Sequence, residues 1–265
     1  MIKSVIRAPD ISPFNIGDKK KQYGCVPFSN GKTTPYSQKE LRDLAPQTYA
    51  YLTQRKSIIE SQSDSSLALR RGDAKRGGEH FYSLGKIGLY TTAPHIVVYR
   101  DNGNNAAAVM QDRPMPWGEI ARPVTEKHGA IISQTNDCFF HETTGEMIKT
   151  KKELSRLSKE HQKAYWQQVV RNITEDESYY ICGILNTPIV NSYFLLSADP
   201  RGISKVNIVG SIKIPLYDSN DKNHLELVSI SKKATQQGFV TNAQLKSLDT
   251  AYRKMVSESD KPANK

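Results

Sequence analysis

Thr174-Glu-Asp-Glu-Ser-Tyr-Tyr-Ile-Cys-Gly-Ile-Leu-Asn-Thr-Pro188 is the stretch of the chain that most constrains the fold. Thr174 and Glu177 stand at the spacing of a capping box, in which each side chain accepts a hydrogen bond from the backbone N–H of the other residue. Apolar residues then recur at helical spacing, at positions 180, 181, 184 and 185. Because proline has no backbone N–H to donate, Pro188 ends this helix or starts a new one. We therefore expect a helix that begins after Thr174 and stops before Pro188.

The same signals predict the other helices. Ser37 and Glu40 form a capping box before a short helix, and a second helix starts at Pro46. Thr150 and Glu153 form another capping box, followed by apolar residues at positions 154, 157, 164, 165 and 169, which predicts a helix of about five turns. Residues 242–257 place large apolar side chains on one face of a final helix.

Short segments rich in β-branched residues and bounded by turn residues predict strands. They are residues 95–100, 106–110, 130–133, 138–140, 206–208 and 212–214. The first 36 residues are rich in proline and glycine, so we expect an extended arm there.

These elements predict an α+β fold, in which a central mixed, largely antiparallel sheet is flanked by helices and the C-terminal part is helical. We divide the chain into three regions. An arm and the helices that follow it occupy residues 1–65, a middle region occupies residues 66–173, and a helical part with short strands occupies residues 174–265.

Composition favours a polyanionic partner. The chain has 37 lysines and arginines against 27 aspartates and glutamates, a net charge of +10 and a pI near 9.4. Neutralising phosphates releases their condensed counterions, so an excess of cations favours nucleic acid. No apolar run approaches the roughly 20 residues that span a bilayer, and the N-terminus lacks the apolar core of a signal peptide. We expect a cytoplasmic protein that does not bind a membrane.

Sequence patterns of catalysis are missing. An amino-methyltransferase needs a glycine-rich turn and an Asn- or Asp-Pro-Pro-aromatic loop, and the chain contains no Pro-Pro dipeptide. Gly85 and Gly88 lack the third glycine and the strand–turn–helix setting of a cofactor loop. Glu146 and Lys149 do not have the spacing of a metal-dependent nuclease, and the histidines show no two-ligand spacing. We therefore predict neither catalytic residues nor a metal site.

Tyr179–Phe194, followed by Arg201-Gly-Ile-Ser-Lys205 and Ile212-Lys-Ile-Pro-Leu216, resembles a known family. It is similar to the C-terminal target-recognition domain of Taq-type N6-adenine DNA methyltransferases and of fused type II restriction-modification enzymes. That family carries a Tyr-x-x-Gly-x-Leu-Asn-Ser-like helix start, an Arg-rich turn and an Ile-Pro strand end. Four more segments match it in the same order: Pro46–Leu52, Phe81–Gly85, Pro94–Asp101, in which His95 replaces the usual lysine, and Leu225–Ser231.

The resemblance implies a noncatalytic, sequence-specific DNA-recognition module of a restriction-modification system. Enzymes of this family clamp duplex DNA between a catalytic and a recognition domain, and the target adenine is flipped out. Residues 66–173 would then be the target-recognition region. The implied partners are double-stranded DNA and a catalytic methyltransferase or endonuclease domain or subunit. No cofactor is expected in this chain, whereas S-adenosylmethionine is expected for the associated catalytic domain.

Nine residues are candidates for DNA contact. Four cations lie on the glycine-rich loop at residues 70–78, where long side chains can become ordered on DNA, and two lie in the turn that resembles the DNA-facing turn of the family. One arginine and one tyrosine flank the predicted sheet, where arginine can pair bidentately with guanine. One lysine precedes a strand end. In chain order these candidates are Arg70, Arg71, Lys75, Arg76, Tyr82, Arg100, Arg201, Lys205 and Lys213.

Three other interpretations stay open. A stand-alone nuclease with an unrecognised acidic cluster predicts metal-dependent cleavage of DNA. A noncatalytic protein-interaction scaffold that uses the helices around Tyr165 and Tyr180 predicts no salt-dependent binding of DNA. A regulatory DNA-binding protein would compete for sites without modifying them.

Overall fold

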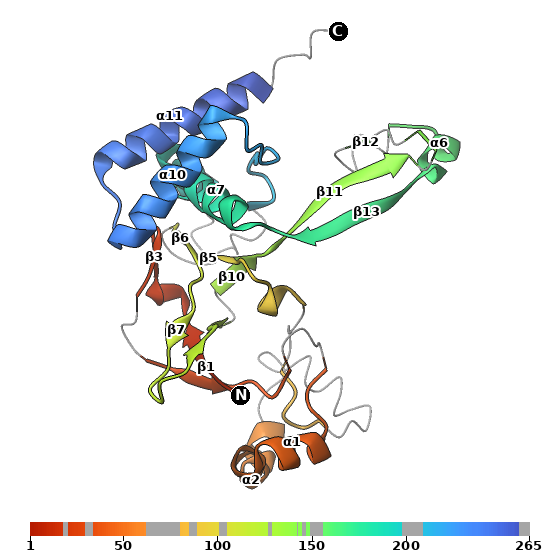
Figure 1. Cartoon of the computed structure of the whole chain (residues 1–265), viewed down its shortest axis with the longest axis vertical. Helices are drawn as coiled ribbons and strands as arrows, with labels where there is room; N and C mark the ends of the chain where they lie inside the picture. Colours follow the sequence, from red (N-terminus) through yellow and green to blue (C-terminus); the bar gives the residue numbers. More distant parts are fainter. Residues whose placement is uncertain are drawn as a thin grey trace. The chain divides into compact units, whose positions relative to one another are not determined.

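The structure is a computed structural model in which the chain forms two compact units (Figure 1). It describes residues 1–17, 21–29, 34–61, 80–84, 89–100, 105–126, 129–141, 143–144, 147–148, 156–197 and 209–259. Unit 1 comprises Met1–Ile6, Lys19–Ala93 and Gln111–Val124. Unit 2 comprises Arg7–Asp18, Pro94–Met110 and Thr125–Lys265. Each unit is therefore built from separate parts of the sequence, and its boundaries differ from the three predicted regions.

The described residues of unit 1 form a small sheet, a hairpin, three short α-helices and a 3₁₀ turn (Leu89–Thr92). The sheet has the order β4 (Tyr23–Cys25), β1 (Ile2–Ile6), β9 (Val124–Thr125). The hairpin joins β7 (Arg113–Pro114) to β8 (Ile120–Ala121). The helices are α1 (Gln38–Leu44), α2 (Pro46–Gln54) and α3 (Lys56–Ser61).

The predicted starts of the first two helices are confirmed. Ser37 caps α1: its hydroxyl accepts from the Glu40 backbone N–H at 3.2 Å, and the Glu40 carboxylate accepts from the Ser37 backbone N–H at 2.7 Å. Pro46 is the first residue of α2. Leu41 and Leu52 bury their side chains in the small core of this unit. The capping signals therefore located both helices correctly.

In its described residues, unit 2 is built around a three-stranded antiparallel sheet and four helices of ten or more residues. The sheet has the order β10 (Gly129–Ile132), β5 (Val97–Arg100), β6 (Ala107–Val109). The helices are α7 (Glu175–Leu185), α8 (Pro188–Ser197), α10 (Lys222–Gln237) and α11 (Asn242–Ser259). Helix α7 packs against β5 and β6, and α10 and α11 pack against α7. The predicted α+β class is confirmed, with antiparallel strands in separate small sheets and a helical C-terminal part.

Helix α7 forms the centre of the core of unit 2. Thr174 accepts from the Glu177 backbone N–H at 3.2 Å, and Glu177 accepts from the Thr174 backbone N–H at 2.7 Å, so the predicted capping box is present. Residues 177–185 are all buried. At Gly183 an added Cβ would lie 2.6 Å from the hydroxyl of Ser231 on α10. The glycine therefore permits the close approach of the two helices.

Residues 7–16 join this core instead of forming an extended arm. They contain a short 3₁₀ turn (Ala8–Asp10) and the strands β2 (Ile11–Ser12) and β3 (Asn15–Ile16). Phe14 is fully buried in the core cluster that contains α7, α10 and α11. The Phe14 backbone N–H donates to the Ala107 carbonyl at 2.8 Å.

A two-stranded ribbon replaces the last part of the long helix predicted at residues 150–169. Strand β11 (Gln134–His141) pairs antiparallel with β13 (Tyr165–Asn172), beginning at Gln134↔Asn172 and ending at His141↔Tyr165. The short strand β12 (Met147–Ile148) pairs with β11, and the single helical turn α6 (Lys159–Lys163) precedes β13. The helix prediction is wrong from residue 165 onward, where aromatic and β-branched residues favour a strand once a partner strand is available. Residues 149–155, with the predicted cap, lie outside the described residues.

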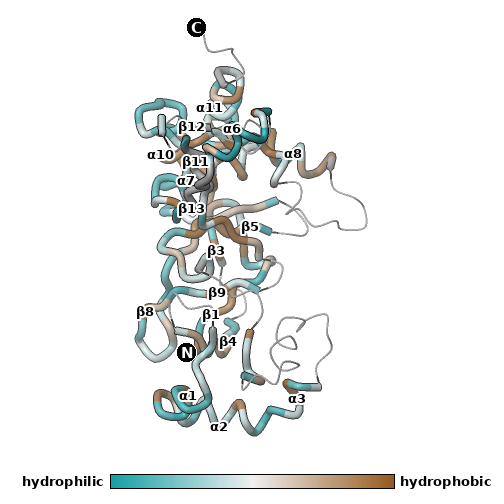
Figure 2. The backbone as a smooth tube through the Cα atoms, turned by 90° about the vertical axis from the view of Figure 1, so that its right-hand side faces the viewer, coloured by the Kyte–Doolittle hydropathy of each residue, from teal (hydrophilic) through white to brown (hydrophobic). Residues whose placement is uncertain are grey.

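Four of the six predicted strands are confirmed. Strands β5, β6, β10 and β11 confirm the predictions at 95–100, 106–110, 130–133 and 138–140. Residues 212–214 form no strand, although Ile212 and Ile214 pack against the core of unit 2. Residues 206–208 lie outside the described part of the chain. Figure 2 shows hydrophobic residues along β5 and α8, yet no described helix has both the length and the apolar composition to cross a bilayer.

Candidate nucleic-acid interface

The β11–β13 ribbon is joined to the core of unit 2 by an ion pair at its base. Arg171, near the end of β13, donates from Nη1 and Nη2 to the two carboxylate oxygens of Glu177, each at 2.6 Å. The Glu177 side chain is only 8% exposed, and that of Arg171 is 39% exposed. Glu177 is also the third helical residue of the capping box that begins α7 at Thr174. One buried carboxylate therefore holds both the first turn of the helix and the root of the ribbon.

The hydrogen bonds that Glu177 accepts determine the direction in which its pKa is shifted. Donation from Arg171 holds the pKa of Glu177 below its ordinary value, although burial acts in the opposite direction. The backbone N–H and the hydroxyl of Thr174 lower this pKa further. A bidentate pair between a guanidinium and a carboxylate fixes orientation as well as distance. The pair therefore fixes the orientation of the Arg171 side chain relative to the first turn of α7.

The far end of the ribbon carries exposed cations. His141 packs edge-on against the buried Tyr165, with ring centroids 4.8 Å apart, where the pairing of β11 and β13 ends. Ser158 caps α6 by accepting from the His161 backbone N–H at 3.2 Å. Arg156, Lys159 and Lys163 lie exposed in and just before α6. Figure 1 shows β12 and α6 at the end of the ribbon away from α7.

This geometry suits the major groove of duplex DNA. The groove, roughly 12 Å wide, admits an α-helix or a two-stranded β-ribbon, and each base pair presents a distinct pattern of donors and acceptors there. Lysine and arginine at the end of such a ribbon can bind phosphate oxygens, which fix the position of the protein on the duplex. The ribbon and its cations form what we call the ribbon-tip surface: β11, β13 and residues 156–163.

Asn186 gives the motif Ile-Leu-Asn-Thr-Pro a structural role. It follows α7 and is 7% exposed. Its amide nitrogen donates to the Ala107 carbonyl at 2.8 Å and to the Cys182 carbonyl at 2.9 Å. Its amide oxygen accepts from the Ala107 backbone N–H at 3.0 Å. The side chain therefore pairs with β6 as a neighbouring strand would, and links the end of α7 to the sheet.

Most of the DNA-contact residues predicted from the sequence lie outside the described residues. These are Arg70, Arg71, Lys75 and Arg76 of the glycine-rich loop, and Arg201 and Lys205 of the Arg-Gly turn.

Tyr82 and Arg100 are occupied by structural contacts. Tyr82 is 3% exposed, and its hydroxyl donates to the Tyr36 carbonyl at 2.7 Å, so its ring belongs to the core of unit 1. Arg100 at the end of β5 donates from Nε to the Ile11 carbonyl at 2.7 Å and from Nη2 to the Pro9 carbonyl at 3.4 Å. Both contacts favour a role in holding segments of the chain together over a role in reading bases.

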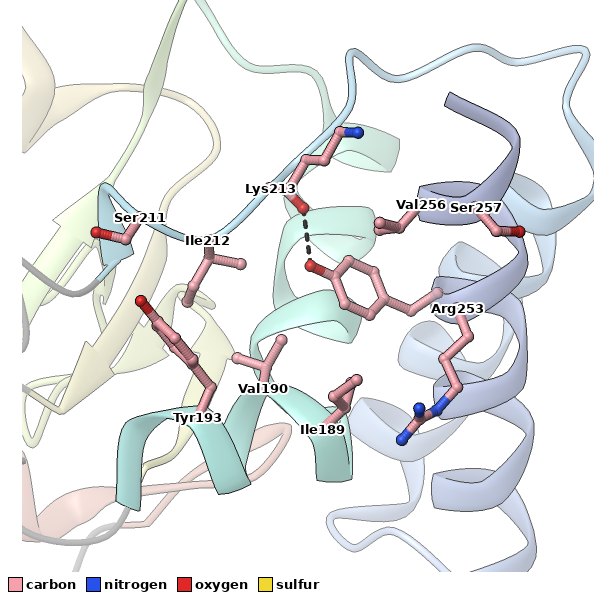
Figure 3. A pocket seen from close by; sticks show the side chains of 10 residues that line it. Ile189, Val190, Tyr193, Ser211, Ile212, Lys213, Arg253, Val256 and Ser257 are labelled. Atoms are coloured by element: carbon pink, nitrogen blue, oxygen red, sulfur yellow. Dashed lines mark hydrogen bonds between the residues drawn. The ribbon is translucent and has the colours of Figure 1, made fainter. Parts of the chain in front are cut away.

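Lys213 lies beside an apolar cleft of about 510 Å³ between α8, α11 and residues 211–213 (Figure 3). The Lys213 carbonyl accepts from the Tyr252 hydroxyl at 2.9 Å, which fixes this segment against α11. In Figure 3 the Lys213 side chain points away from the apolar residues of the cleft. Those residues are Ile189, Val190, Tyr193, Ile212 and Val256.

The opposite side of the cleft is shaped by Asp249. Its two oxygens accept from the Ile189 backbone N–H at 2.9 Å and from Arg253 Nε at 2.8 Å. Asp249 thus ties the first turn of α8 to α11, and Arg253 is paired at the edge of the cleft. Because Arg253 is paired with Asp249, the described lining of the cleft is mainly apolar.

Within the described part of the chain, no three histidine, cysteine, aspartate or glutamate side chains are grouped so that they could hold a metal ion. The sequence analysis missed the ribbon-tip surface because it predicted one long helix at residues 150–169, whereas residues 165–169 belong to β13. The charge pattern was visible, but the strand that positions it was not.

Compared with known proteins, the chain matches no family model and no curated protein. The resemblance to the target-recognition domains of adenine methyltransferases therefore stays a prediction.

Proposed function

We propose that the chain is the sequence-recognition module of a restriction-modification system, which binds duplex DNA without catalysing a reaction itself. The observation that carries this proposal is the ribbon-tip surface, a two-stranded ribbon that is anchored by Arg171 and Glu177 and ends in exposed cations. The net charge of +10 supports the same kind of partner.

A catalytic N6-adenine methyltransferase or endonuclease, as a further domain or a separate subunit, completes the proposed system. That partner binds S-adenosylmethionine, whereas this chain positions the DNA and selects the sequence that is bound. The family resemblance of residues 179–194 supports this assignment, and the linkage of Asn186 to β6 gives a physical reason for an asparagine at that position.

The first experiment is selection from a randomised duplex library by the purified chain at two salt concentrations, followed by sequencing of the retained DNA. Phosphate contacts weaken steeply as salt rises, whereas contacts to base edges carry the sequence information. We expect a short defined motif that is retained at the higher salt.

A matched pair of variants tests the ribbon tip. The triple variant Arg156→Ala, Lys159→Ala, Lys163→Ala removes the three exposed cations near α6. The control, Lys222→Ala, Lys246→Ala, Lys254→Ala, removes three exposed cations from α10 and α11 and changes the net charge equally. If each tip cation contacts a phosphate, the slope of log affinity against log salt falls by about 3 in the tip variant. The control variant keeps most of its slope.

Each outcome decides between functions. Equal slopes in the two variants would mean that the ribbon tip is not the interface. Retention of DNA without any motif would contradict sequence recognition by this chain alone. Divalent-metal-dependent cutting of plasmid would replace the proposal by a nuclease, and absence of salt-dependent binding would replace it by a protein-interaction scaffold.

A further inference from the structure

Unit 1 presents an exposed aromatic pair that none of the contacts described above explains. Tyr23 of β4 is 41% exposed, and Trp117, in the turn between β7 and β8, is 53% exposed. Their ring centroids are 6.1 Å apart and the rings are inclined by 50°. Ile120, on the same hairpin, is 72% exposed. These three side chains form what we call the aromatic patch.

The turn that carries Trp117 is closely defined. The Met115 backbone N–H donates to the Glu119 carbonyl at 2.7 Å, and the Gly118 backbone N–H donates to the Met115 carbonyl at 2.9 Å. Gly118 has a φ of 89°, which glycine adopts without strain. Trp117 Nε1 donates to the Glu119 carboxylate at 3.0 Å, which restrains the ring. Little conformational entropy is therefore left to lose when the ring binds a partner.

The same hairpin buries other side chains. Met115 is 4% exposed and Ala121 is 6% exposed, so the hairpin packs on unit 1 while Trp117 and Ile120 stay in water. Exposed large apolar groups cost free energy in proportion to their area, and when they are clustered they commonly mark binding surfaces. Tryptophan and tyrosine combine a large flat surface with a polar group, as contact residues often do.

Charge around the patch favours an anionic partner. In the segments that adjoin it, residues 1–5, 21–25 and 111–122, the cations outnumber the carboxylates. Arg122 is paired with Asp112 at the base of the hairpin, and Lys21 lies exposed two residues before Tyr23. The cations are Lys3, Lys21, Arg113 and Arg122, and the carboxylates are Asp112 and Glu119.

We infer that the aromatic patch is a stacking site for an unpaired nucleobase of bound DNA, with Trp117 as the principal platform. This inference rests on the proposed function. In an intact duplex the faces of the bases are already stacked on one another, so an exposed indole finds a free face only at an unpaired base or a strand end. Stacking of a base on an aromatic side chain is tolerant of sequence, and nearby cations bind the phosphates that flank it.

Fluorescence provides a direct measurement because the chain has only two tryptophans, Trp117 and Trp166. Trp166 belongs to β13, so the Trp166→Phe variant is used only after its affinity for the paired duplex is shown to match that of the wild type; its emission then reports Trp117 alone. The titrants are a fully paired duplex, the same duplex with one unpaired adenine, and a single strand of equal length. We expect strong quenching by the two DNAs that contain unpaired bases and weak quenching by the paired duplex.

Affinity provides the second measurement. The Trp117→Ala variant should lose about fivefold to 150-fold in affinity for the duplex with the unpaired base. Trp117→Phe should recover part of that loss, because phenylalanine keeps an aromatic face. Phe239→Ala is the control, since Phe239 is another exposed aromatic residue, 58% exposed and in unit 2. Circular dichroism of each variant confirms that it is folded.

The two proposals fail in different ways. If DNA binds in a salt-dependent way while Trp117 is not quenched and Trp117→Ala binds like the Phe239→Ala control, the stacking site is refuted and the proposed function stands. Equal quenching by paired and unpaired DNA would also refute the stacking site. If none of the three DNAs binds, both proposals are wrong.

Discussion

Replacement of Glu177 by alanine should destabilise unit 2 more than any other change in the first turn of α7. The carboxylate accepts two hydrogen bonds from Arg171 at 2.6 Å and one from the Thr174 backbone at 2.7 Å. Loss of the bond within the capping box costs about 1 kcal/mol. Loss of the bidentate pair costs about 2 kcal/mol, because Arg171 is 39% exposed and water replaces part of what it loses.

The total of about 3 kcal/mol is large enough to measure. For a unit of this size, each kcal/mol lowers Tm by roughly 2–4 °C, so the variant should melt about 6–12 °C below the wild type. Thermal unfolding followed by circular dichroism gives the value. Glu175→Ala is the matched control: Glu175 is an exposed carboxylate in the same turn, and its loss should cost less than about 1 kcal/mol.

A double-mutant cycle separates the two contributions. Arg171→Ala removes the pair but leaves the capping box, so Arg171→Ala and Glu177→Ala together should cost clearly less than the sum of the single changes. Additive costs, or a Glu177→Ala variant that melts with the Glu175→Ala control, would refute the idea that one carboxylate holds both helix and ribbon.

Three further predictions concern the same unit. Above the ordinary glutamate pKa of about 4.5, the wild type should have a higher Tm than the Glu177→Gln variant. This difference in Tm should shrink as the pH falls through the lowered pKa of Glu177 in the folded state. Thermal melting at a series of pH values measures it. Gly183→Ala should cost about 1–3 kcal/mol in denaturant unfolding because its Cβ would lie 2.6 Å from the Ser231 hydroxyl; adding Ser231→Ala should recover part of the loss. Asn186→Asp should lower Tm more than Asn186→Ala, since a carboxylate would face the Ala107 and Cys182 carbonyls without a proton to donate.

Local signals were sufficient for the helices with chemically specific ends. The capping boxes at Ser37 and Thr174 and the prolines at positions 46 and 188 located α1, α2, α7 and α8, because these signals act within one turn of the chain. The apolar spacing at residues 245–255 located α11 for the same reason.

Features that depend on distant partners could not be read from the sequence. Residues 165–169 fit a helical spacing, but β11, about 30 residues earlier in the sequence, provides a strand to pair with. Ile212 and Ile214 look like strand residues, yet they meet the core of unit 2 without a neighbouring strand. The role of Arg100 also follows from tertiary structure, since its partners are carbonyls near the N-terminus.

Composition predicts a class of partner but does not locate a site on the fold. Excess positive charge is a property of composition, and it pointed to a polyanionic partner. Which cations share a surface depends on the ribbon, and the exposure of Trp117 depends on how its hairpin packs. Neither is encoded in local spacing.

The burial of Phe14 has a consequence for how the protein emerges from the ribosome. Phe14 is synthesised more than 200 residues before the helices α10 and α11 that share its core cluster. At synthesis rates of roughly 5–20 residues per second, the phenylalanine waits on the order of 10 s or more for that core to be completed. During this time residues 7–16 have no finished site to occupy. A nascent chain stalled before α10 should therefore expose the side chain of Phe14 and be a substrate for chaperones, whereas a chain that includes α10 and α11 buries it.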